Sequence, residues 1–153
     1  MFMDIKHKVG IKESSKKVFE ALSTVEGISQ WWTRDTRGDN HERGKIYFSF
    51  QKRLDKSFDV AAEIKELSPS KRICWKILEG SKEWLETEIS FDLIPSEEET
   101  IVHFSHQNWS ALTDFMAQCN TKWAVFLLSL KSLLETGKGS PFPDDVRIGH
   151  FEA

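Results

Sequence analysis

The apolar positions in the last third of the chain follow a helical period. Between residues 113 and 136 they recur at spacings of three and four, which is typical of an amphipathic helix. The positions are Phe115, Met116, Cys119, Trp123, Phe126, Leu127, Leu130, Leu133 and Leu134. This face is wider than a solvent-exposed helix requires, so we expect it to pack on a large apolar surface. Gly137 follows as a helix stop, and residues 138–153 are predicted to form an irregular tail.

Earlier segments alternate apolar and polar residues with a period of two, the pattern of half-buried strands. Six such runs are expected, at residues 5–11, 45–51, 58–67, 72–79, 85–94 and 100–108. Short connections between consecutive runs favour antiparallel neighbours with one apolar face. The apolar face is predicted to carry Phe48, Val60, Trp75 and Phe91, with Leu85 on the same side as Phe91.

Two short helices are expected between the first two strands. Ser14 or Ser15 offers an N-cap for the first, and residues 25–32 form the second, which ends in Trp31 and Trp32. Residues 33–44 are charged and contain glycine, so they are predicted to form an exposed loop. This loop is either simply solvated or a lid over a cavity.

Length and composition are typical of one globular domain of 153 residues. The net charge is −3 with acidic and basic residues interspersed, which argues against nucleic acid as a main partner. The longest apolar run, residues 123–128, is far shorter than the ~20 residues that cross a bilayer. The first residues lack the features of a signal peptide, so a cytoplasmic location is expected. Cys74 and Cys119 are expected to be buried free thiols.

The order of one strand, two short helices, five strands and a long helix resembles the helix-grip superfamily, which includes START lipid-transfer domains and the major birch-pollen allergen. Residues 15–22 and 27–32, residues 104–109, and Trp123 with the leucine-rich run to Gly137 are most similar to the family named for the activator of the heat-shock-protein-90 ATPase. The resemblance implies an α+β fold over residues 1–137, with a curved antiparallel sheet of about six strands around a long C-terminal helix. The superfamily hosts lipid carriers, polyketide cyclases and co-chaperone domains, so the resemblance leaves several activities open.

Catalytic and metal-binding patterns find little support. His103 and His106 are three apart on a predicted strand, so their side chains point to opposite faces and cannot share an ion. No nucleophile elbow or glycine-rich phosphate loop occurs, and neither a cofactor nor a metal is expected. His106 stands out because it shares a face with Val102 and Phe104. It would orient a ligand, act as a general base, or simply be satisfied within the core.

A twisted sheet curves away from a straight helix, and six tryptophans and eleven phenylalanines are available to line the space between them. We therefore expect a hydrophobic or amphipathic small molecule, such as a lipid, a polyketide-like compound or an aromatic compound, to bind there without catalysis. The candidate ligand-binding residues are Trp31, Trp32, Phe48, Trp75, Phe91, His106, Trp109, Trp123, Phe126 and Leu127. The alternatives are a co-chaperone-like or stress-related interaction domain, with a protein partner or a homodimer, and a cyclase or hydrolase that uses His106.

Overall fold

The computed structural model describes residues 2–51 and 57–149 of the chain. Within these residues there are seven strands and three helices. The strands are β1 (Met3–Ile11), β2 (Asp35–Gly38), β3 (Lys45–Gln51), β4 (Ser57–Ser68), β5 (Arg72–Glu79), β6 (Glu88–Pro95) and β7 (Thr100–Trp109). The helices are α1 (Ser15–Ser23), α2 (Val25–Ile28) and α3 (Asp114–Thr136).

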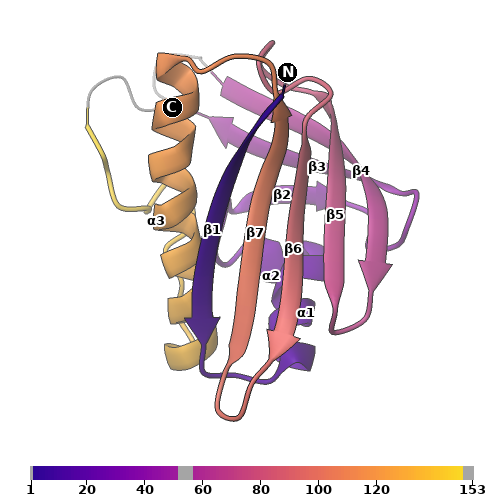
Figure 1. Ribbon diagram of the computed structural model, residues 1–153, viewed down its shortest axis with the longest axis vertical. Helices are drawn as coiled ribbons and strands as arrows, with labels where there is room; N and C mark the ends of the chain where they lie inside the picture. The colour runs from indigo at the N-terminus through magenta and orange to yellow at the C-terminus, as the bar shows by residue number, and fades with distance from the viewer. Residues whose placement is uncertain (1, 52–56, 150–153) are drawn as a thin grey trace.

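The described strands form one antiparallel sheet in the order β1-β7-β6-β5-β4-β3-β2. In Figure 1 the sheet curls from β1 through β4 to β3 and β2 behind, and α3 runs beside β1 along the open side. The short helices α1 and α2 lie behind β6 in this view. The predicted α+β fold, with a curved antiparallel sheet, two short helices after the first strand and a long C-terminal helix, is confirmed.

One strand was not expected. The sequence predicted an exposed loop over residues 33–44, but β2 lies within it and pairs with β3. Thr33 and Thr36 are buried there, and their hydroxyls donate to the carbonyls of Ser49 and Thr33 respectively, both at 2.7 Å. The buried side chain of this strand is a threonine, so the strand shows no apolar alternation and the pattern missed it.

The segment before β6 also departs from the expectation. β6 begins at Glu88 rather than at residue 85, because Glu86 has a left-handed backbone with φ of 67° that interrupts an extended chain. Leu85 is exposed instead of facing the core. The segment forms a tight turn in which Thr87 and Trp84 are buried, and both contribute to the site described below.

Helix α3 has the expected ends. The Thr113 hydroxyl accepts from the Met116 N–H at 3.1 Å and caps the N-terminus. Gly137 ends the helix in a left-handed conformation with φ of 87°, and its N–H donates to the Leu133 carbonyl at 2.9 Å. The prediction of one continuous helix over residues 113–136 is therefore confirmed.

The inner face of the sheet carries the predicted apolar residues. Phe48 pairs with Val60 across β3 and β4, and Phe91 lies on β6 beside β5, which carries Trp75. These four side chains are at most 2% exposed. Trp32, which follows α2, stacks on Trp75 with ring centroids 5.8 Å apart, so the short helices close this part of the core.

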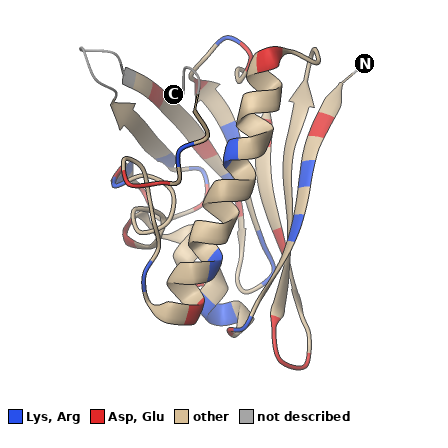
Figure 2. Cartoon of the chain, turned by 90° about the vertical axis from the view of Figure 1, so that its left-hand side faces the viewer, with Lys and Arg blue, Asp and Glu red and all other residues tan. Residues whose placement is uncertain are grey.

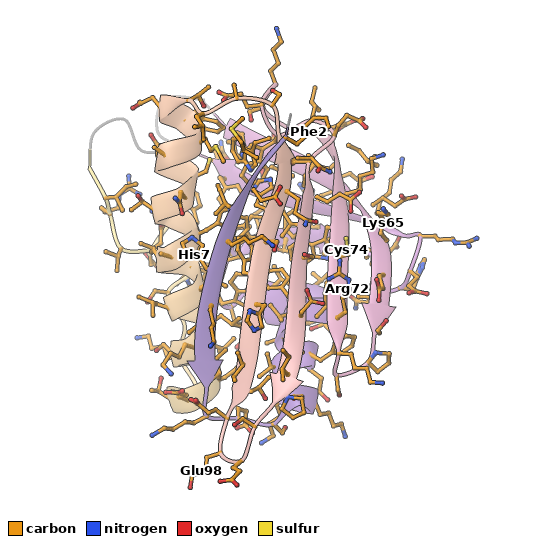
Figure 3. All side chains as sticks on the ribbon, in the orientation of Figure 1. Phe2, His7, Lys65, Arg72, Cys74 and Glu98 are labelled. Carbon is orange, nitrogen blue, oxygen red and sulfur yellow. The ribbon has the colours of Figure 1, made fainter. Side chains whose placement is uncertain are left out.

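The outer face of the sheet is polar. Figure 3 shows Lys65, Arg72 and Cys74 on this face of β4 and β5. The Arg72 guanidinium donates to Asp92 at 2.7 Å and to Glu66 at 3.1 Å. Basic and acidic residues are interspersed over α3 and the strands in Figure 2. Among the helices in the described part of the chain, none is long and apolar enough to cross a membrane.

Residues 138–149, which we call the C-terminal strap, contain no helix but pack against the domain. The backbone of Phe142 bridges to Thr33, its N–H donates to the Trp32 carbonyl at 2.8 Å, and its carbonyl accepts from the Arg34 N–H at 3.2 Å. The Phe142 ring is buried against Phe50, with centroids 5.4 Å apart. The strap is thus irregular in backbone form and firmly attached to the core.

Candidate ligand-binding pocket

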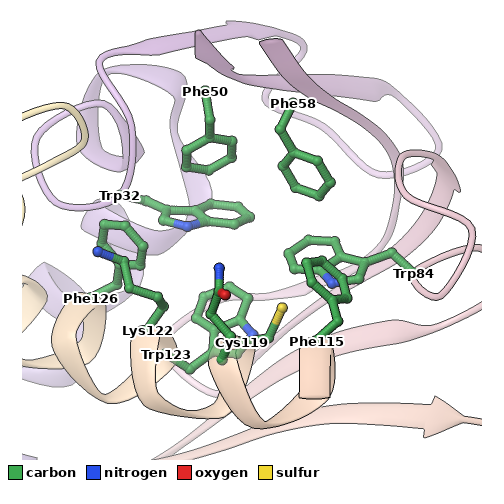
Figure 4. Close-up of a pocket in the computed structure, with 10 residues that line it drawn as sticks. Trp32, Phe50, Phe58, Trp84, Phe115, Cys119, Lys122, Trp123 and Phe126 are labelled. Carbon is green, nitrogen blue, oxygen red and sulfur yellow. The ribbon is translucent and has the colours of Figure 1, made fainter. Parts of the chain in front are cut away.

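A pocket of about 60 Å³ lies between α3 and the adjacent ends of β3 and β4, and it is partly open to solvent. In Figure 4 the side chains of α3 form one wall, Phe50 and Phe58 face them, and Trp32 and Trp84 stand at the sides. The lining residues are Trp32, Phe50, Phe58, Trp84, Phe115, Gln118, Cys119, Lys122, Trp123 and Phe126.

The walls follow from simple local geometry. Phe115, Cys119, Lys122 and Phe126 are three or four residues apart along α3, so they form one stripe on its surface. On the sheet, Phe50 pairs directly with Phe58, and their ring centroids are 6.0 Å apart. Directly opposed residues project from the same face of an antiparallel pair.

Ring-to-ring contacts connect the two walls. The Trp32 ring lies 5.0 Å from Trp123 and 5.4 Å from Phe50, measured between centroids. Trp84 lies 5.4 Å from Phe58 in an edge-on arrangement and stacks on Trp123 at 6.2 Å. Such arrangements suit the quadrupoles of aromatic rings, so the pocket is bounded by a rigid aromatic frame.

Two weak polar groups occur in this frame. The indole N–H of Trp84 is buried and has no oxygen or nitrogen acceptor among the described residues. The Cys119 thiol, whose sulfur is only a weak acceptor, also lines the pocket. Burial raises the pKa of the Cys119 thiol to about 12, so it stays protonated and a poor nucleophile at neutral pH. The predictions of buried free thiols at Cys74 and Cys119 are confirmed.

His106 lies behind the pocket wall, on β7, and is completely buried. The Thr87 hydroxyl donates to the Trp84 carbonyl at 2.6 Å, so it accepts from the imidazole Nε2–H at 2.9 Å. Nδ1 then accepts from the Trp123 indole N–H at 3.1 Å. Burial lowers the pKa of His106 to about 3. The imidazole is therefore neutral, with both ring nitrogens engaged, and its visible function is to hold the indole of Trp123 in place.

The structure separates the ten candidate residues into two groups. Trp32, Trp123 and Phe126 line the pocket. The other candidates are buried in the packed core outside its wall; they are Trp31, Phe48, Trp75, Phe91, His106, Trp109 and Leu127.

Sequence reasoning did not select the other lining residues, which are Phe50, Phe58, Trp84, Phe115, Gln118, Cys119 and Lys122. Those on α3 could have been found by extending the stripe of Trp123 and Phe126 towards the N-terminus. Trp84 was counted among the six tryptophans that could line the space, but no periodic stripe singled it out, because it lies in the turn before β6.

No cluster of three or more His, Cys, Asp or Glu side chains that could hold a metal ion occurs in residues 2–51 and 57–149. The pocket wall offers aromatic surface, one ammonium group at Lys122 and one amide at Gln118. This arrangement can bury apolar surface and orient a single polar group of a ligand.

A curved antiparallel sheet closed by a long C-terminal helix is the arrangement of the helix-grip class of α+β proteins. Within this class, the chain belongs to the family described as "Activator of Hsp90 ATPase homolog 1-like protein", whose model matches residues 12–135. Among curated proteins, no sequence matches the chain.

Solved structures agree with this family. The Aha1 dimer from Colwellia psychrerythraea is 44% identical, with a TM-score of 0.78 over 90% of this chain and 99% of that chain. Protein SSP2350 from Staphylococcus saprophyticus is 20% identical, with a TM-score of 0.70 over 90% of this chain and 95% of that one. Protein MLL2253 from Mesorhizobium loti is 14% identical, with a TM-score of 0.73 over 87% and 97%. The last two show the shared fold alone.

Proposed function

We propose that the protein binds a small apolar molecule, without catalysis, in the pocket between α3 and the ends of β3 and β4. The composition of the pocket wall is the observation that supports this most. Of the ten described residues that line it, seven are aromatic. Water forms few hydrogen bonds with such a wall. An apolar ring that enters the pocket leaves water, and this stabilises the complex by about 25 cal/mol per Å² of buried apolar surface.

The volume of the pocket limits the size of the ligand. A volume of about 60 Å³ corresponds to roughly two water molecules at their liquid volume of about 30 Å³ each. Sites for drug-sized ligands have roughly 300–1,000 Å³. Because the pocket is partly open to solvent, it suits one ring of an aromatic compound or the end of a chain, with the rest of the ligand at its mouth. A whole lipid or polyketide would require it to widen.

The state of the nearby polar groups supports binding over catalysis. Both nitrogens of His106 are hydrogen-bonded inside the core, so neither is available to take a proton from a substrate. The Cys119 thiol has a raised pKa of about 12 and is not activated as a nucleophile. A cyclase or hydrolase built on His106 would need this network to be broken first.

Calorimetric titration with a neutral aromatic probe, 2-naphthamide, tests the proposal. Cys119→Met adds apolar bulk inside the pocket and should weaken binding at least tenfold. Leu128→Met is the matched control, since Leu128 lies on the exposed side of the same helix, and it should bind like the wild type. Absence of binding to 2-naphthamide, or equal binding by the two variants, would contradict the proposal.

A second candidate function is self-association, in line with an interaction domain. The observation that favours it is the 44% identity to the Colwellia psychrerythraea protein, which is a dimer. Sedimentation equilibrium at micromolar concentration should then give twice the chain mass of 17.7 kDa, whereas a single species at the chain mass would reject it.

We place the protein in the cytoplasm, where its two free cysteines would stay reduced.

A further inference from the structure

We propose that the ligand is an amphipathic anion, with an apolar body and a carboxylate, and that its carboxylate replaces Asp145 as the partner of Lys122. This exchange releases the C-terminal strap and widens the pocket. The inference rests on the proposed function and adds to it the charge of the ligand and the way in which the pocket opens.

Lys122 provides the positive charge in the pocket wall. Its side chain extends from α3 along Phe126, with the ammonium nitrogen 5.3 Å from the ring centroid, and Figure 4 shows the two side chains together at one side of the pocket. The ammonium group donates to the Asp145 carboxylate and, at 3.0 Å, to the Val146 carbonyl. The side chain of Lys122 is 12% exposed and that of Asp145 is fully buried.

The Asp145 carboxylate is incompletely compensated in this position. One oxygen binds Lys122, but Oδ1 is buried and has no hydrogen-bond partner among the described residues. Removing a carboxylate from water is costly unless all of its acceptor sites are satisfied. Exchange for another carboxylate lets Asp145 return to water while Lys122 keeps an ion pair, so the exchange recovers hydration that the closed state lacks.

The strap holds the pocket narrow through Phe142. This ring packs edge-on against Phe50, which is itself a wall residue and faces Phe126 across the pocket at 6.5 Å between centroids. Two backbone hydrogen bonds, to Trp32 and from Arg34, hold Phe142 in place. When the strap leaves, Phe50 loses its backing and the space of the Phe142 ring joins the pocket.

A second ion pair also attaches the strap near Phe142, and it is more exposed. Arg34 and Asp144 form an ion pair at 2.5 Å, but both side chains are about 60% exposed, and exposed pairs contribute little. The buried pair of Lys122 and Asp145, by contrast, joins a residue of the pocket wall directly to the strap.

A pair of isosteric probes tests the ligand charge. Calorimetry with 2-naphthoate and the neutral 2-naphthamide should show about tenfold tighter binding of the carboxylate by the wild type. Lys122→Met should remove this preference, so that the two probes bind with equal affinity. Lys131→Met is the matched control: Lys131 is also on α3, but it contacts Glu135 and the Gly10 carbonyl outside the pocket, so the preference should persist.

A double variant controls for misfolding of the single Lys122→Met variant. Lys122→Met leaves a buried carboxylate without its partner, so Lys122→Met combined with Asp145→Asn provides a neutral pair of similar shape and should also bind both probes equally. Equal binding of the two probes by the wild type, or a preference that survives in both Lys122 variants, overturns the inference. If neither probe binds, the proposed function itself fails.

Hydrogen exchange tests the release of the strap. The amides of Arg34 and Phe142 make the two backbone hydrogen bonds that hold Phe142 in place, so their exchange should accelerate at least tenfold on saturation with 2-naphthoate and should not accelerate with 2-naphthamide. Unchanged protection of both amides in the naphthoate complex would show that the anion binds without moving the strap, and would overturn this part of the inference.

Discussion

Acidification should destabilise the fold through His106. Burial lowers the pKa of this imidazole from 6.5 to about 3, whereas the unfolded chain protonates a histidine near its ordinary pKa. Between these two values the unfolded state binds more protons than the folded state, so the free energy of unfolding falls as the pH falls. The contribution is fully present above about pH 6.5 and is lost progressively towards about pH 3.

The two pKa values set the size of the effect. One pKa unit corresponds to about 1.4 kcal/mol, so the loss relative to pH 7 is about 2 kcal/mol at pH 5 and about 3 kcal/mol at pH 4. Protonation of Nδ1 explains the cost in structural terms. This nitrogen accepts a hydrogen bond from the indole N–H of Trp123. A proton on it would place two hydrogen-bond donors opposite each other inside the core with no acceptor between them.

Urea unfolding of the wild type and of His106→Gln at pH 7, 5 and 4 isolates this contribution. All other titrating groups are common to both proteins, so the difference between their unfolding free energies should shrink by the amounts given above. His103→Gln changes an exposed histidine on the same strand and should follow the wild type at every pH. Parallel pH curves for the wild type and His106→Gln would refute the reasoning, because they would show that His106 can be protonated in the folded state.

Four substitutions test the packing and the ends of the helices. Leu130→Ala should lower the free energy of unfolding by roughly 2–5 kcal/mol, since this side chain is completely buried on α3. Leu128→Ala, at a position 61% exposed, should lower it by less than about 0.5 kcal/mol. Equal shifts in urea midpoint for the two variants would reject the helix orientation. Gly137→Ala should cost about 1 kcal/mol by thermal unfolding, because its φ of 87° is unfavourable for alanine although its Cβ would meet open space. Gly27→Ala should cost more than Gly137→Ala, because its Cβ would lie 2.7 Å from the Ala21 Cα and force α1 and α2 apart; a smaller loss would contradict this close approach.

The fold was predictable because its main elements have strong periodic patterns. The inward positions of β3 and β6 alternate strictly, and a shift of one residue would move Phe48 or Phe91 into solvent. In α3, Leu130 and Trp123 share the buried face, and a threonine cap and a glycine stop mark the ends. Each of these signals is local, so one sequence is enough to read it.

The elements that were missed or misplaced lack such signals. β2 is a short edge strand whose buried residue is Thr36, and its polarity resembles that of a loop. Leu85 continues the alternation of β6 towards the N-terminus, but the left-handed backbone at Glu86 ends the strand first. Glutamate is not a residue that marks such a conformation, so the turn follows from tertiary packing around Trp84 and Thr87.

The sequence could predict that aromatic residues line a space between helix and sheet, but not where the boundary of the pocket lies. Periodicity shows that Trp123 and Phe126 face the sheet, but it does not show whether facing side chains touch, because that depends on the distance between α3 and the sheet. Here the distance is fixed partly by the strap, where Phe142 backs the wall at Phe50 and Asp145 anchors Lys122. The strap has no period of its own, so no local pattern gives its position. The boundary of the site is therefore set by the part of the chain that carries the weakest sequence signal.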